Sequence, residues 1–300
     1  MMSQKEREHA GWGDRRSSGN ALPRRPHTVL APLDATIQSL SALPVAQALA
    51  GILGATLHVV YVGERILSPR DVMQKLGLTA EQMQGSIIHQ ATGIPAEEIV
   101  RLARRWHSSV ITMCTHTDEQ KPRGKLGRVT AGVLDQSPIP VVLVHPERGE
   151  NPWSLKHIVV PHEGTPTAAA AIGYATDLAD QTGAELIVLH LTGAEGPRPA
   201  EPGSFTGPRY LDQPQHEWRA WAKEFLTRAH SMDIPPAGVR LRLLVAKGEL
   251  APAIIRCVHQ SDGDLIVLAW RGHLEAERAA TIKAVTSDAP CPILIVRVGE

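Results

Sequence analysis

Short aliphatic runs alternate with longer segments of helical period along this chain, and the same order of segments occurs twice. Residues 27–34 (HTVLAPLD) and 156–163 (KHIVVPHE) each open one series with an aliphatic run that ends at a turn. Three later pairs of predicted strands also correspond between the two series. The first pair, 54–62 and 183–191, opens with Gly-Ala, and the second pair is 109–113 and 264–268. The third pair consists of the closing Pro-x-Pro runs, 138–144 and 290–296. Internal repetition of this kind predicts two copies of one domain.

Helical segments between these strands carry one apolar stripe each. In the helix that begins near Pro95, the stripe is Ile99, Leu102 and Trp106. In the helix that begins near Leu250, it is Ile254, Cys257 and Val258. Strands that alternate with amphipathic helices of this length are typical of βαβ units. We therefore predict an α/β fold of two tandem doubly wound, Rossmann-like domains, each with a mainly parallel five-stranded sheet.

Composition shifts suggest the domain boundaries. Residues 1–26 are polar and lack an apolar period, so we predict a disordered tail. The first domain then covers 27–146, a linker rich in turn formers covers 147–155, and the second domain covers 156–298. A Gly- and Pro-rich stretch at 193–214 is predicted to be a loop inserted in the second domain.

Charge and cysteine content exclude several classes of protein. The 31 Lys and Arg residues balance 31 Asp and Glu residues, which argues against a broad basic surface for nucleic acid or anionic membranes. Three cysteines without a CxxC pair do not form a disulfide framework or a zinc knuckle and suit a reducing compartment. Charged residues stand near the N-terminus where a signal peptide has its apolar stretch, and no apolar run reaches about 20 residues. We expect a cytoplasmic protein with no membrane or nucleic-acid partner.

The repeated strand order, the Asp that ends the first strand and the closing (A/S)PxP-aliphatic run resemble the universal stress protein family in its tandem form. The resemblance covers residues 27–146 and 156–298. It implies a regulatory stress-response protein with ATP or another adenine nucleotide as a possible ligand. From the residues themselves, which offer no identified catalytic base or metal ligand, we expect no metal and no enzyme activity. In nucleotide-binding members, a Gly-x2-Gly-x9-Gly-(Ser/Thr) loop after the fourth strand holds the phosphates, the first-strand acid contacts ribose or adenine, and an apolar second-strand residue backs the base.

Carried onto the first half, the resemblance gives a tentative nucleotide site: Pro32, Leu33, Asp34, Val62, Met113, Cys114, Thr117, Lys125, Gly127 and Arg128. The loop reads Cys114-x2-Thr117-x9-Gly127-Arg128, so two glycines carry side chains and Arg replaces the hydroxyl. The cations Lys121, Arg123, Lys125 and Arg128 either contact phosphate through their side chains or form a solvated basic loop. Asp34 either contacts the nucleotide or caps the following helix. Cys114 is either a small buried residue or a reactive thiol.

The equivalent site in the second half is predicted to be degenerate. Its residues are Pro161, His162, Glu163, Leu191, Ala269, Gly272, Ala279 and Ala280. The loop is shorter, lacks the hydroxyl and contains Glu275 and Glu277, which would repel a triphosphate. We expect no nucleotide there, and the pair His162–Glu163 has a metal or acid–base role as its alternative interpretation.

Three functions follow as hypotheses. The first is a regulatory stress protein with at most one weak adenine-nucleotide site, in the first half. The alternative is a scaffold for unknown protein partners in which both sites are degenerate. The third is slow ATP hydrolysis, for which the sequence offers no identified base or metal ligand. We also expect the closing strands, 141–144 and 293–296, to pair antiparallel as an intramolecular pseudo-twofold dimer, because an unpaired apolar edge strand invites association.

Overall fold

The computed structural model describes residues 28–116, 126–148, 151–162, 166–192, 239–270 and 277–298. The first half contains β1 (Thr28–Leu33), the 3-10 helix η1 (Gln38–Ala42), α1 (Leu43–Leu53), β2 (Thr56–Gly63), α2 (Pro69–Leu76), β3 (Ser86–Thr92), α3 (Pro95–Arg105), β4 (Val110–Cys114), α4 (Arg128–Gln136) and β5 (Val141–Val144). The second half contains β6 (His157–His162), α5 (Pro166–Thr182), β7 (Glu185–Thr192), β8 (Arg240–Lys247), α7 (Leu250–Gln260), β9 (Leu265–Trp270), α8 (Glu277–Asp288) and β10 (Ile293–Arg297). A second 3-10 helix, η2 (Pro146–Arg148), follows β5.

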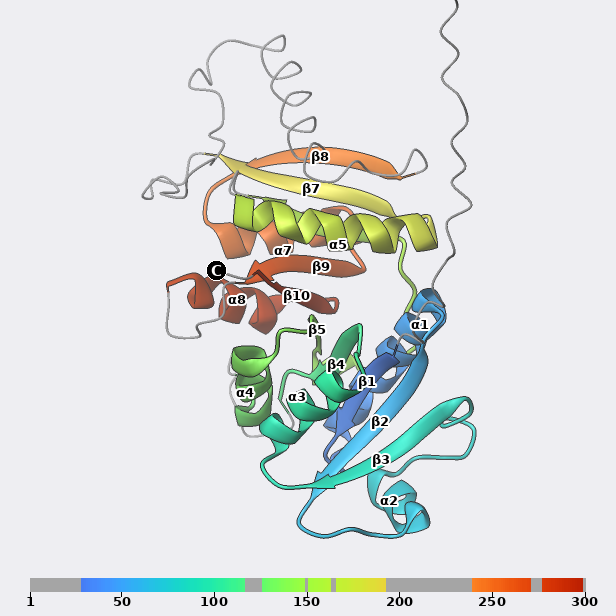
Figure 1. The fold of residues 1–300 in the computed structure, drawn as a ribbon. Helices are drawn as coiled ribbons and strands as arrows, with labels where there is room; N and C mark the ends of the chain where they lie inside the picture. Colours follow the sequence, from blue (N-terminus) through green and yellow to red (C-terminus); the bar gives the residue numbers. More distant parts are fainter. Residues whose placement is uncertain are drawn as a thin grey trace, which may run out of the picture.

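The strands form one ten-stranded sheet in the order β3-β2-β1-β4-β5-β10-β9-β6-β7-β8 (Figure 1). Pairing within each half is parallel, and the order 3-2-1-4-5 of the first half recurs in the second. The predicted fold class, two Rossmann-like α/β units with mainly parallel sheets, is confirmed. Figure 1 shows the two halves stacked, with β5 and β10 between them.

The closing strands of the two halves pair antiparallel. Val142 faces Leu294, and these residues hold the same position in the two Pro-x-Pro runs. Leu143 pairs with Ile293, and Val141 pairs with Ile295. When each residue is replaced by its counterpart in the other run, these two pairs change places. A pseudo-twofold axis therefore passes between Val142 and Leu294.

Local sequence explains how the helices begin and end. Ser68 caps α2 by accepting a hydrogen bond from the Asp71 N–H, and Pro69 follows at the first helical position. Gly77 ends the same helix in the left-handed conformation, with φ of 65°. In α3, acidic residues lie in the first turn and Arg104 and Arg105 in the last, which complements the helix dipole.

Two apolar layers cover the sheet. Side chains of α1, α2 and α5 pack on one face, and those of α3, α4, α7 and α8 pack on the other. The strands between them are almost wholly aliphatic and buried, with Val29, Leu30 and Ala31 fully inaccessible. This is the pattern expected of a parallel sheet with both faces covered.

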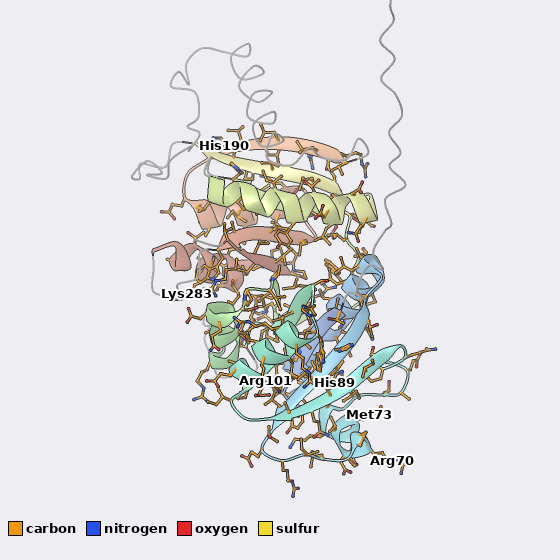
Figure 2. The ribbon with its side chains drawn as sticks, viewed as in Figure 1. Arg70, Met73, His89, Arg101, His190 and Lys283 are labelled. Atoms are coloured by element: carbon orange, nitrogen blue, oxygen red, sulfur yellow. The ribbon has the colours of Figure 1, made fainter. Side chains whose placement is uncertain are left out.

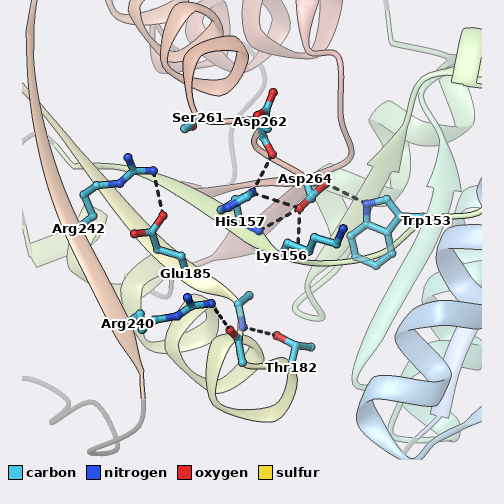
Figure 3. Close-up of polar contacts among 12 residues, drawn as sticks. Trp153, Lys156, His157, Thr182, Glu185, Arg240, Arg242, Ser261, Asp262 and Asp264 are labelled. Atoms are coloured by element: carbon cyan, nitrogen blue, oxygen red, sulfur yellow. Dashed lines mark hydrogen bonds and ion pairs between the residues drawn. The ribbon is translucent and has the colours of Figure 1, made fainter.

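The segment between the halves is attached to the start of β9. Asp264 Oδ2 accepts hydrogen bonds from the backbone N–H groups of Lys156 (2.8 Å) and His157 (2.9 Å). The Trp153 indole N–H donates to the Asp264 carbonyl at 3.0 Å (Figure 3). A further bond joins the two halves, since the Arg297 guanidinium on β10 donates to the Asp135 carbonyl on α4 at 2.6 Å. The Asp264 bonds therefore hold Trp153 and the start of β6 against β9, and the Arg297 bond links β10 to α4 of the first half.

Replacing Asp264 should measure that attachment. In Asp264→Ala, two backbone N–H groups lose their acceptor, so we expect the free energy of unfolding to fall by about 1–3 kcal/mol. Asp264→Asn keeps an acceptor oxygen and should lose less than half as much. Urea unfolding followed by circular dichroism checks both values, and equal losses in the two variants would contradict a role for the acceptor.

Several predicted segments lie outside the described residues. They include the predicted tail at 1–26 and the inserted loop at 193–214. In the part of the chain that the structure describes, no helix is both long enough and apolar enough to span a membrane.

Candidate functional site

A cavity of about 400 Å³ lies at the carboxyl ends of β1, β2 and β4 in the first half. Eight of the ten residues predicted for this site line it: Pro32, Leu33, Asp34, Val62, Met113, Cys114, Gly127 and Arg128. Thr117 and Lys125 lie outside the described residues, as do Lys121 and Arg123. The residues named from the sequence are thus brought together in space, and their role in nucleotide binding stays a prediction.

Topology explains why the cavity is there. The chain passes from β1 to β2 on one side of β1, whereas β4 pairs on its other side. Connections that leave in opposite directions open a crevice at the strand ends, which is where doubly wound folds bind ligands. Residues that sequence reasoning missed also line this crevice: Pro95 and Ile99 from α3, His116, and Val129 and Thr130 from α4. The Ile94-Pro95 start of α3 is the sequence signal that would have indicated the first of these.

The N-terminus of α4 opens onto the cavity. Gly127 is the N-cap residue, α4 has no side-chain cap, and Gly127, Arg128, Val129 and Thr130 all line the cavity. The first-turn N–H groups of a helix lack intrahelical partners and carry the positive end of the helix dipole. The geometry suits an anionic group at this end of the cavity.

Gly127 is favoured by a close approach to the neighbouring backbone rather than by an unusual backbone conformation. Its φ is −60°, which any residue adopts. A Cβ at this position would lie 3.3 Å from the His116 Cα and 3.4 Å from the Thr115 carbonyl oxygen. The Gly127 N–H donates to that carbonyl at 2.8 Å, and the Thr130 hydroxyl donates to the Cys114 carbonyl at 3.0 Å. Both groups therefore anchor α4 to the end of β4.

Asp34 is held in a turn at the rim. Its Oδ1 accepts hydrogen bonds from the Thr36 N–H (3.1 Å) and the Thr36 hydroxyl (2.6 Å). The N-cap residue of η1 is Ile37, so the interpretation of Asp34 as a helix cap is wrong. Between Asp34 and Thr36, Ala35 has a φ of 68°, a left-handed conformation that costs a non-glycine residue about 1–3 kcal/mol. The loop thus places an exposed carboxylate at the cavity.

Cys114 is a buried thiol. It ends β4, and its backbone is not among the described positions with positive φ, so a side chain replaces the family glycine here without backbone strain. The thiol lies 2.9 Å from the His116 carbonyl and 3.7 Å from the Ser41 hydroxyl. Burial raises the pKa of the Cys114 thiol above its ordinary value. Burial and the raised pKa of the Cys114 thiol favour a packing role over a reactive thiol.

The equivalent region of the second half contains two buried histidines. His162 ends β6 and pairs in register with His190 of β7, where the first half has Leu33 and Tyr61. Figure 2 shows where His190 lies on β7. His162 is 5% exposed and His190 is 2% exposed. His190 Nδ1 lies 3.0 Å from the His162 carbonyl oxygen. Burial, aided by His190, lowers the pKa of His162 to about 4. Burial also lowers the pKa of His190. Both rings are therefore neutral at pH 7.

The other second-half positions are distributed as follows: Pro161 on β6, Leu191 on β7, Ala269 on β9, and Ala279 and Ala280 on α8. Glu163 and Gly272 lie outside the described residues, so the pair His162–Glu163 stays a prediction. Ala280 is exposed in the first turns of α8, which begins at Glu277, whereas Arg128 is the first residue of α4. Within the described ranges, no three His, Cys, Asp or Glu side chains are placed to hold a metal ion.

Comparison with known proteins identifies the family that has this architecture. The model of the Universal stress protein family matches residues 26–145 and 154–297. A universal stress protein from Archaeoglobus fulgidus has 17% sequence identity and a TM-score of 0.58, over 90% of this chain and 98% of that one. A putative universal stress protein from Pseudomonas aeruginosa has 16% identity and a TM-score of 0.61, over 91% and 93%. Curated proteins give no significant match. The chain belongs to the universal stress protein family and carries the family's domain twice.

Proposed function

We propose that the protein is a regulatory stress-response protein that binds one adenine nucleotide, weakly, in the cavity of the first half. Family membership supports the stress-response role. The observation that carries the nucleotide proposal is the N-terminus of α4, which opens onto the cavity beside Arg128. A volume of about 400 Å³ also falls within the usual range of small-molecule sites, roughly 300–1,000 Å³.

The apolar wall of the cavity suits a base. Val60 and Val62 come from β2, and Pro95 and Ile99 come from α3. A flat, largely apolar heterocycle placed against these side chains would bury apolar surface. Asp34, at the same end of the strands, supplies an acceptor for ribose hydroxyls or for the adenine amino group.

The other end of the cavity suits phosphate, but with fewer donors than a glycine-rich loop. The Gly127 N–H and the Thr130 hydroxyl already bond to the chain itself, which leaves the first-turn N–H groups of α4 and the Arg128 side chain. Side-chain cations make longer and more mobile phosphate contacts than a glycine nest, and salt screens them. We therefore expect weak affinity that falls as the salt concentration rises.

Replacing Arg128 tests this arrangement. In Arg128→Ser, we expect the affinity for ATP to fall by about five- to tenfold and its salt dependence to become shallower, because a charge-assisted phosphate contact is lost. Isothermal titration calorimetry with ATP, ADP and AMP at two salt concentrations measures both effects. Arg105→Ser removes the same charge at the end of α3 opposite Pro95 and should leave binding unchanged.

The other outcomes of that titration are equally informative. Tighter binding by Arg128→Ser would mean that Arg128 obstructs a site to which serine restores a hydroxyl. Unchanged binding would show that Arg128 has no part in it. If the wild-type chain itself binds none of the three nucleotides at millimolar concentration, the scaffold function is favoured, as it is by the internal bonds of Gly127 and Thr130.

A further inference from the structure

A second cavity, of about 720 Å³, lies where the two halves meet. Val142 and Leu294, the pair on the pseudo-twofold axis, form part of its floor, together with Val110 and Leu265, which are equivalent in the two repeats. The walls are α1 of the first half and α5 of the second, which pack on the same face of the sheet. No described residue lines both this cavity and the candidate nucleotide cavity.

The two walls differ chemically although the repeats place them symmetrically. The α1 wall is apolar and consists of Leu49, Ile52 and Leu53. The α5 wall contains Asp177 and Asp180, both exposed. When the two repeats are aligned on the Gly-Ala pair before β2 and β7, Asp177 and Asp180 correspond to Ala48 and Gly51 of the first half. The carboxylates are therefore a property of one wall, not of the repeat.

Other groups at the rim are also attractive to a cation. The carboxyl end of α1 lines the cavity through Leu53 and Gly54, and this helix has no basic residue in its last turn to offset the negative end of its dipole. Tyr174 lines the same rim with 45% of its surface exposed, and aromatic faces attract cations. None of the described residues that line the cavity is Lys, Arg or His.

We propose that this junction cavity binds a small amphipathic organic cation, that is, a protonated amine on an aliphatic or aromatic body. The body lies on the apolar floor formed by the closing strands, and the ammonium group lies between the α5 carboxylates and the end of α1. A neutral analogue gains only the apolar contacts, and an anionic analogue is repelled. The ligand contacts both halves, so its binding stabilises their junction, and it does so whether or not a nucleotide binds in the first half.

Octylammonium, 1-octanol and octanoate are matched probes for this proposal, since they share one alkyl chain and differ in charge. Calorimetric titration of the full chain at low salt should show one saturable octylammonium site per chain. Its affinity should exceed that for octanol by about tenfold, because charge-assisted contacts add to the apolar ones, and octanoate should bind more weakly than octanol. Equal affinities for octylammonium and octanol, or a stoichiometry well above one, would overturn the proposal.

Two sets of variants locate the site. Asp177→Asn with Asp180→Asn should lower octylammonium affinity to that of octanol, and both positions are exposed, so the variant should fold. Asp135→Asn with Asp288→Asn removes two exposed acids from α4 and α8, on the other face of the sheet, and should leave binding unchanged. Ile52→Trp, which fills the cavity from the α1 wall, should abolish binding of all three probes. Wild-type octylammonium affinity in either the α5 pair or Ile52→Trp would show that the cation binds elsewhere.

Discussion

Acidification should destabilise the protein well above the pH at which carboxylates titrate, and His162→Leu should remove much of this effect. His162 is 5% exposed, and burial holds its pKa at about 4, against about 6.5 in an unfolded chain. Between these values the unfolded state binds the proton and the folded state does not, so stability falls as pH decreases from about 6.5 towards 4. From pH 7.5 to pH 5 the loss due to this residue is about 2 kcal/mol.

The variant His162→Leu places in the second half the residue that Leu33 provides in the first, on the equivalent strand. Urea unfolding at pH 7.5 and pH 5 should give a smaller pH-dependent loss in the variant than in the wild type, by about 2 kcal/mol. His259→Leu replaces an exposed histidine on α7 and serves as the control. An identical pH dependence in wild type and His162→Leu would show that His162 is not kept neutral by the fold. His190 should add to the loss of stability on acidification, because burial also lowers its pKa.

The sequence predicts the fold of this protein well because the information is repeated. Strands such as 141–144 are unambiguous where Pro-x-Pro precedes four aliphatic residues, and the second copy at 293–296 removes the remaining ambiguity. The family resemblance assigned residues as distant as Pro32 and Gly127 to one site, and the parallel strand order explains why they line one cavity, since it places the carboxyl ends of β1 and β4 together.

Features that depend on three-dimensional contacts could not be predicted in this way. The preference for glycine at 127 comes from the backbone of residues 115 and 116, which only the folded loop brings near. The partner of Asp34 is Thr36 rather than a helix N-terminus, because the chain makes a turn and a 3-10 helix before α1 begins. His190 was missed because its partner, His162, is distant in sequence and the strand register alone brings them together.

The junction cavity illustrates a further limit of sequence reasoning. Its floor exists because β5 and β10 pair with Val142 opposite Leu294, and its walls exist because α1 and α5 cover the same face. Each half alone contributes only an apolar helix or a helix with two surface acids. Neither pattern indicates a binding site until the antiparallel register places them around one space.

The contact between α3 and α4 should be intolerant of a single added methyl group, because the two helices approach closely at Gly132 and Ala96. A Cβ on Gly132 would lie 2.8 Å from the Ala96 Cβ, closer than two side-chain carbons approach. Ala96 is buried on a helix and cannot move without its backbone. Ala favours a helix over Gly by about 1 kcal/mol, but overpacking of a rigid contact costs about 1–3 kcal/mol. We expect Gly132→Ala to lower the free energy of unfolding, by up to about 2 kcal/mol, the difference between these two effects.

Gly51→Ala provides the matched control, since Gly51 lies in α1 with no atom within 4 Å of an added Cβ, and this variant should be stabilised by about 1 kcal/mol. Restoring space with Ala96→Gly in the Gly132→Ala background should recover part of the loss, which identifies the α3–α4 contact as its cause. Pro95 and Arg128, at the starts of these two helices, both line the cavity, so the single variant should also bind ATP more weakly than the double variant. Stabilisation by Gly132→Ala equal to that of Gly51→Ala would mean that the helices separate freely. The distance between the base wall and the phosphate end of the cavity would then not be set by this contact.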